Sequence, residues 1–170
     1  MPCGDVDAWR RELLIAGGLV RDGEASVCEE AGPRHDRYVE LVDMVDDTEG
    51  PAVVHALIAS LRAEEDHGAH EAVYGALERF PGKDLVRGTV LAVPDLLSIP
   101  RDHSGQVLQL LTLPAGDEDL RVFTAAGRRL EPGLRAGLVA LITDHEADEW
   151  LADERSHGRL RLTQDQGVGA

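Results

Sequence analysis

The chain has 170 residues and a mass of 18.4 kDa, the size of one domain with an ordinary hydrophobic core. Aspartate and glutamate total 32 against 17 lysines and arginines, so the formal net charge is -15, which makes nucleic acid and anionic lipid poor partners and favours a basic one. A hydrophobic fraction of 43% excludes a wholly disordered acidic chain.

Apolar residues recur at steps of three and four along most of the chain, which predicts helices. Asp5 is expected to cap a first helix that carries Trp9 and Leu13 and stops at Gly17-Gly18. The stretch from Arg21 to Pro33 is acidic and thinly apolar, and fits either a short helix or a loop. After this stretch, apolar residues at helical spacing predict a helix that carries Tyr38, Leu41, Val42 and Val45.

Later helices are predicted to begin at Pro51, Asp117 and Pro132, while Asp84 and Asp102 are each expected to cap a helix that follows. One further helix carries residues 69–80 and ends at Pro81-Gly82. Pro94 lacks a backbone donor and should kink or split the helix that follows Asp84. A short acidic helix around Trp150 and Leu151 is expected to complete the body.

Helix pairs are thus expected to begin near Pro51, Asp84 and Asp117, at a constant spacing of 33 residues. This period predicts an all-α fold, a short α-solenoid of stacked helical hairpins. An irregular helical bundle is the alternative, because spacing alone fixes neither handedness nor stacking order. The expected organisation is an N-terminal helix and variable segment packing on the body over 1–33, a helical-repeat domain over 34–160, and a disordered tail over 161–170.

Neither a targeting signal nor a thiolate site is indicated. The N-terminus lacks a basic start followed by an apolar run, and no stretch approaches the roughly 20 apolar residues of a membrane span. Cys3 and Cys28 form no C-x-x-C pair. We therefore expect a soluble cytoplasmic protein with free thiols and no membrane partner.

Three histidine patterns are candidates for metal or catalytic sites. His67 and His70 stand three residues apart but match no zinc-protease spacing, and polar residues at a solvated helix start explain them better. The other two patterns combine histidine with glutamate, both of which can bind a metal ion. They are Glu64-x-x-His67 with Glu154-x-x-His157, and the adjacent pairs His70-Glu71 and His145-Glu146. With no G-x-S-x-G motif and no phosphate-binding glycine loop, the sequence predicts no enzyme, no cofactor and no metal.

Acidic residues cluster at expected helix ends and turns, so several should line up along one edge of a stacked array. At a helix start they complement the helix dipole, but Asp46, Asp47, Glu64 and Glu65 follow helices, where each costs a few tenths of a kcal/mol. This favours a binding role for the charge. The predicted partner-binding residues are Asp43, Asp46, Asp47, Glu49, Glu64, Glu65, Asp66, Asp117, Glu118, Asp119, Glu146, Asp148 and Glu149.

Three consecutive segments resemble a bacterial family: HEAVYGALERFP at 70–81, VLAVPDLL at 90–97 and QVLQLL at 106–111. In these motifs the chain is similar to the small HEAT-like helical immunity proteins encoded beside polymorphic and contact-dependent toxins. The resemblance spans about residues 51–142, and the chain lacks the tryptophan that such proteins often carry within 106–111. The motif positions are structural, so the resemblance assigns no toxin-contacting residue.

The resemblance implies an immunity protein that binds and neutralises a cognate toxin. The negative charge predicts in addition that this toxin is basic, for which a nuclease is the expected example, and that alanine at Glu64, Glu65 and Asp66 weakens binding. The alternative is a HEAT-like adaptor or scaffold for another bacterial protein. A more distant alternative is a metal-dependent hydroxylase using His-Glu pairs, similar to the HEAT-repeat hydroxylase of hypusine synthesis, which needs four such pairs where this chain has two.

Overall fold

A computed structural model describes residues 5–19, 31–64, 68–113, 116–148 and 150–162. Every regular element in these ranges is an α-helix, as the apolar periodicity predicts. The helices are α1 (Val6–Ala16), α3 (Ala31–Asp43), α4 (Pro51–Ser60), α5 (Ala69–Arg79), α6 (Gly82–Leu91), α7 (Val93–Leu96), α8 (Arg101–Leu110), α9 (Asp117–Gly127) and α10 (Pro132–Asp148). Among them, none combines the length and apolarity needed to cross a membrane.

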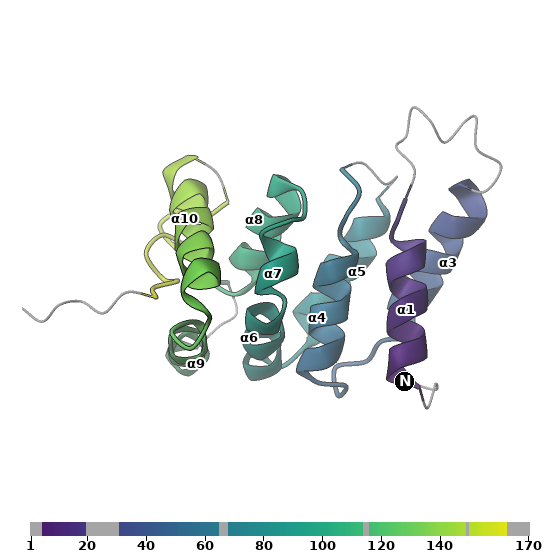
Figure 1. Ribbon diagram of the computed structural model, residues 1–170, viewed down its shortest axis with the longest axis horizontal. Helices are drawn as coiled ribbons and strands as arrows, with labels where there is room; N and C mark the ends of the chain where they lie inside the picture. The colour runs from purple at the N-terminus through teal and green to yellow at the C-terminus, as the bar shows by residue number, and fades with distance from the viewer. Residues whose placement is uncertain (1–4, 20–30, 65–67, 114–115, 149, 163–170) are drawn as a thin grey trace, which may run out of the picture.

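The helices follow one another in two rows. In one row α1 packs on α4, α4 on α6 and α6 on α9, and in the other α3 packs on α5, α5 on α8 and α8 on α10 (Figure 1). The first half is regular, because α1 also packs on α3 and α4 on α5. In the second half α6 and α9 are seen nearly end-on in Figure 1, while α7 and α10 run across the array as α1 and α4 do. The all-α prediction is therefore confirmed, with an arrangement that is less uniform than the constant spacing implied.

Helix α4 forms the centre of the core. Most of its residues are apolar, and Val54, Leu57 and Ile58 are fully buried because α1, α5, α6 and α7 all pack around it. Helix α6 approaches α4 closely at Gly88. A Cβ atom at this position would lie 2.3 Å from Val54 Cβ and 2.7 Å from the carbonyl oxygen of Pro51. The crossing of these two helices thus requires a residue without a side chain.

Several predicted helix ends are confirmed. The Asp5 side chain caps α1, since its Oδ1 accepts a hydrogen bond of 2.9 Å from the Ala8 amide. Helix α4 begins at Pro51 after Gly50, which has a φ of 79° that glycine adopts readily. The predicted split at Pro94 separates α6 from α7.

Other predicted ends are wrong. Asp84 and Asp102 do not cap helices, because α6 begins at Gly82 after Pro81 and α8 begins at Arg101 after Pro100. Both carboxylates lie instead within the first turn, where they complement the helix dipole. The helix expected around Trp150 is also wrong, since residues 150–162 form turns, bends and irregular chain.

The segment 150–162 packs against the end of the array. Leu160 and Leu162 are buried, and Gly127 of α9 leaves the space that Leu162 fills. The Oγ atoms of Ser156 and Thr112 are 2.9 Å apart, which ties this segment to the end of α8. The predicted tail over 161–170 therefore begins too early, because Leu162 belongs to the core, and the part from residue 163 lies outside the described residues. Cys3, Cys28 and most of the stretch 21–33 lie outside them as well.

Candidate functional site

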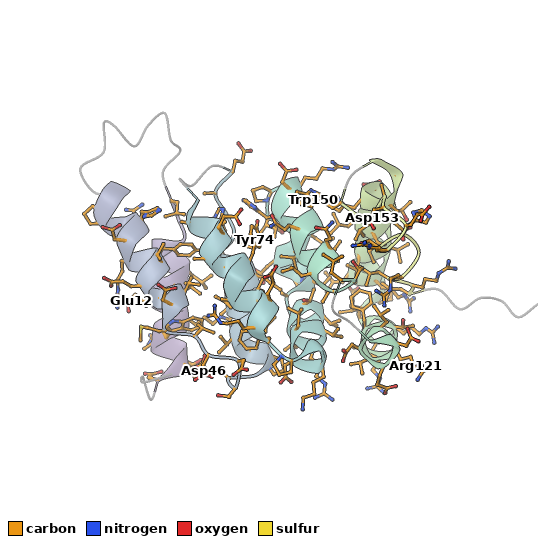
Figure 2. The ribbon with its side chains drawn as sticks, turned by 180° about the vertical axis from the view of Figure 1, so that it is seen from behind. Glu12, Asp46, Tyr74, Arg121, Trp150 and Asp153 are labelled. Atoms are coloured by element: carbon orange, nitrogen blue, oxygen red, sulfur yellow. The ribbon has the colours of Figure 1, made fainter. Side chains whose placement is uncertain are left out.

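Acidic segments that are distant in sequence meet at one edge of the array. Arg79 at the end of α5 donates from Nη2 to the carbonyl oxygen of Val45, a bond of 3.1 Å that joins the α5–α6 junction to the α3–α4 turn. Asp119 at the start of α9 lies directly against Gly82 at the start of α6. Residues 43–49, 78–84 and 117–119 therefore form one continuous region, here called the acidic edge. In Figure 2, the labels of Asp46 and Arg121 mark the same lower border of the molecule.

The acidic edge contains seven of the predicted binding residues. Asp43, Asp46, Asp47, Asp117 and Glu118 are exposed, while Glu49 and Asp119 are half-buried. The structure adds two acids that the prediction left out, Glu78 and Asp84. Arg79 and Lys83 are the basic residues within these ranges, and the Arg79 guanidinium donates to the carbonyl oxygens of Val45 and Gly75. The field of the edge is thus negative.

Asp46 is held in the charged form by its own turn. Its Oδ1 accepts hydrogen bonds from the Thr48 hydroxyl at 2.5 Å and from the Thr48 amide at 2.8 Å. These bonds, the hydroxyl first, lower the pKa of Asp46 from its ordinary 3.8 to about 2. The side chain is fully exposed and therefore presents a fixed negative charge to solvent over the physiological pH range.

The acids of α9 have partly structural roles. Glu118 pairs with Arg121 one turn later, with 3.0 Å between Oε2 and Nη1. All three carboxylates lie in the first turn, where they complement the dipole of α9. Asp117 is the member of this group that is exposed and has no other role in the described structure.

Two further predicted binding residues, Glu64 and Glu146, lie at the opposite edge. Glu64 follows the C-terminus of α4, whereas the acidic edge includes the turn before its N-terminus. Glu146 is near the C-terminus of α10 and accepts a hydrogen bond of 2.8 Å from the Gly158 amide. Glu65, Asp66, Glu149 and the side chain of Asp148 lie outside the described residues. The expected acids thus separate onto two edges.

Three histidines occupy the interior instead of the surface. His103 Nε2 is 2.6 Å from the carbonyl oxygen of Ala63, and its Nδ1 is 2.6 Å from the Tyr74 hydroxyl. A carbonyl only accepts, so His103 donates from Nε2, and in that tautomer Nδ1 accepts from the Tyr74 hydroxyl. The His70 ring lies edge-on to His103 with centroids 4.3 Å apart, and His145 Nε2 contacts the Ser104 hydroxyl at 3.3 Å.

The prediction that His70 lies at a solvated helix start is therefore wrong, because this side chain is 3% exposed. The missed signal is its spacing, since His70 precedes buried Val73 and Tyr74 by three and four residues and so shares their face. Within the described residues, no group of three His, Cys, Asp or Glu side chains is arranged to hold a metal ion. The adjacent Glu71 is exposed and does not follow His70 into the core.

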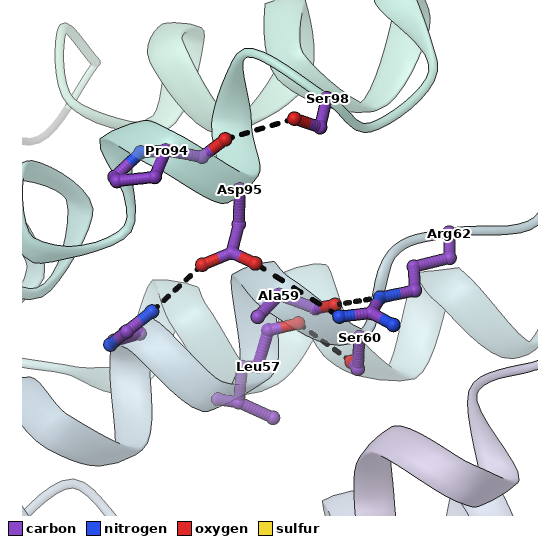
Figure 3. A network of polar contacts seen from close by, with 8 residues as sticks. Leu57, Ala59, Ser60, Arg62, Pro94, Asp95 and Ser98 are labelled. Carbon is purple, nitrogen blue, oxygen red and sulfur yellow. Dashed lines mark hydrogen bonds and ion pairs between the residues drawn. The ribbon is translucent and has the colours of Figure 1, made fainter. Parts of the chain in front are cut away.

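A second polar cluster links α4 to α7 at the surface (Figure 3). Asp95 Oδ2 is 2.9 Å from His55 Nε2, and Asp95 Oδ1 is 4.0 Å from Arg62 Nη2. An Asp-His pair can serve as a catalytic base when it faces a nucleophile. The hydroxyls drawn beside it, those of Ser60 and Ser98, donate to the carbonyl oxygens of Leu57 and Pro94. The observed contacts thus show the His55–Asp95 pair connecting α4 to α7.

Comparison with family models, with curated proteins and with solved structures returned no match.

Proposed function

We propose that this protein binds a basic protein partner through the acidic edge, and that it is an immunity protein that neutralises a bacterial toxin in the cytoplasm of the producing cell. The observation that carries the proposal is the meeting of residues 43–49 and 117–119, which are about 70 positions apart in sequence, on one exposed edge. Carboxylates gathered in this way repel one another. A positively charged partner that binds the edge reduces this repulsion, which favours its binding.

Electrostatics gives this edge a mechanism. A nuclease toxin carries a positive groove for its nucleic-acid substrate, and a protein with an exposed acidic edge can occupy that groove. Long-range attraction speeds the encounter and is screened by salt, so association should slow steeply as ionic strength rises. Asp46 and Asp47 are suited to this role because both side chains are exposed on the α3–α4 turn.

The two rows of helices support a HEAT-like α-solenoid as the finer description of the fold. Ala76, Leu77 and Phe80, which carry the resemblance to HEAT-like immunity proteins, are buried and therefore serve the fold. Glu78 belongs to the same motif and is exposed on the acidic edge. The proposed binding surface is thus built on the part of the chain that resembles the family.

Growth protection tests the proposal. The first observation is whether the adjacent upstream gene encodes a large secreted protein with a toxic C-terminal domain. The chain is then co-expressed with that domain, and colony formation is compared with cells that carry the toxin domain alone. An immunity protein restores growth and forms a complex with the domain. Binding without restored growth would instead favour the alternative role of an adaptor, and the absence of both would overturn the proposal.

A further inference from the structure

An apolar pocket of about 380 Å³ opens on the acidic edge. Its described lining consists of Leu85 from α6, Leu110 and Leu113 from the end of α8, and Glu78 from α5. Leu85 and Leu110 are 3% and 6% exposed and form the floor, while Leu113 is 52% exposed and forms a wall. Glu78 is exposed and places a carboxylate at the rim. A leucine left half in solvent beside two buried leucines leaves apolar area that a partner can cover.

The pocket lies within the acidic edge. Leu85 follows Gly82 by one helical turn, and the Asp119 carboxylate lies against Gly82. Glu78 is adjacent to Arg79, whose bond to the Val45 carbonyl joins this region to the α3–α4 turn. The apolar floor of the pocket and its negative rim therefore belong to one surface. Binding hot spots have the same arrangement, in which an apolar anchor is surrounded by polar contacts.

We propose that this pocket takes a large apolar side chain of the basic partner, best an aromatic ring, with a lysine or arginine beside it that pairs with Glu78. This inference rests on the proposed function and names the chemistry that the acidic edge recognises. Charge complementarity selects the occupant, because the rim carries a carboxylate and a second copy of this chain would bring another net charge of -15.

Two small indoles test the pocket without the partner. Tryptamine carries the ring and a positive amine, while 3-indolepropionate carries the same ring and a negative carboxylate. Each is titrated into the whole protein with methyl-labelled leucines, and binding is followed by the NMR shifts of Leu85, Leu110 and Leu113. We expect millimolar binding of tryptamine at these methyls, and binding of 3-indolepropionate that is about tenfold weaker at low salt.

Variants separate the two parts of the recognition. Leu113→Ala should weaken both indoles at least about threefold because it removes a wall. Glu78→Gln should reduce the preference for tryptamine to less than about twofold and leave the ring binding in place. Leu91→Ala, on a leucine of α6 that is similarly exposed at 55%, is the matched control and should change neither.

Equal affinity for the two indoles, shifts centred on other leucines, or no effect of Leu113→Ala would each overturn the proposal. The result is independent of the toxin. If tryptamine binds as expected but growth protection fails, the pocket proposal is supported and the proposed immunity function is contradicted. If growth protection succeeds and neither indole binds, the proposed function of the acidic edge is supported and the pocket proposal is contradicted.

Discussion

The carboxylate of Asp119 on α9 lies so close to Gly82 on α6 that a Cβ atom on Gly82 would be 2.3 Å from its Oδ2. These residues are 37 positions apart, and their contact places the first turns of two helices side by side. The same contact brings the acids of α9 next to those of the α5–α6 junction. The proposed binding surface is therefore a direct result of how two helices pack.

The crossing of α4 and α6 gives a stability prediction. Gly88→Ala should lower the free energy of unfolding by about 1–3 kcal/mol, because the new methyl meets Val54 and the Pro51 carbonyl in a filled interior. Gly75→Ala is the matched control, since a Cβ there meets no described atom within 4 Å. It should raise the free energy of unfolding by about 0.5–1 kcal/mol through helix propensity. Urea denaturation measures both, and an equal effect of the two substitutions would contradict the close crossing.

The buried tyrosines should differ in their contribution to stability. Tyr74→Phe removes the hydroxyl that donates to His103 Nδ1 in the core, which should cost about 1–3 kcal/mol. Tyr38→Phe removes a hydroxyl that contacts Ser60 Oγ, but Ser60 keeps its bond of 2.7 Å to the Leu57 carbonyl. The cost should therefore be smaller, about 0.5–1.5 kcal/mol. Chemical denaturation compares the two variants, and a larger loss in Tyr38→Phe would show that the assigned hydrogen-bond roles are wrong.

Asp46 should titrate well below an ordinary aspartate. Its pKa is lowered from 3.8 to about 2 by the Thr48 hydroxyl and amide, so its charged form favours the folded state above about pH 4. That contribution is lost as the pH falls from about 4 through about 2. Thr48→Ala should raise the pKa part of the way toward 3.8, while Thr48→Ser, which keeps the hydroxyl, should not. Carboxyl NMR titration gives the midpoint, and an unchanged value in Thr48→Ala would refute this assignment.

Much of the helical framework follows from local patterns in the sequence. The Asp5 cap, the Gly50-Pro51 start and the split at Pro94 each depend on neighbouring residues alone, and each is present. The predicted caps at Asp84 and Asp102 are wrong because Pro81 and Pro100 occupy the N-cap positions of α6 and α8. Local rules do not rank two candidates that lie only two or three residues apart, because sequence patterns place helix ends to within about one or two residues at best.

The candidate surface could be predicted only in part. The charge clusters were visible in the sequence, but Glu64 and Glu49 flank opposite ends of α4 and so belong to different edges. Their separation depends on helix length and direction, which become clear only when helix ends are known. The pocket was not predictable, because Leu113, Leu85 and Glu78 come from different elements and meet through tertiary packing.

The association rate with the toxin domain tests the central claim most directly. One variant removes four charges from the acidic edge by D46N, D47N, D117N and E118Q, and a matched variant removes four exposed charges elsewhere by E71Q, D102N, D144N and E154Q. Stopped-flow mixing at low salt should show association about tenfold slower for the first variant and within about twofold of the original for the second. An equal or greater loss in the second variant would contradict the assignment of binding to the acidic edge.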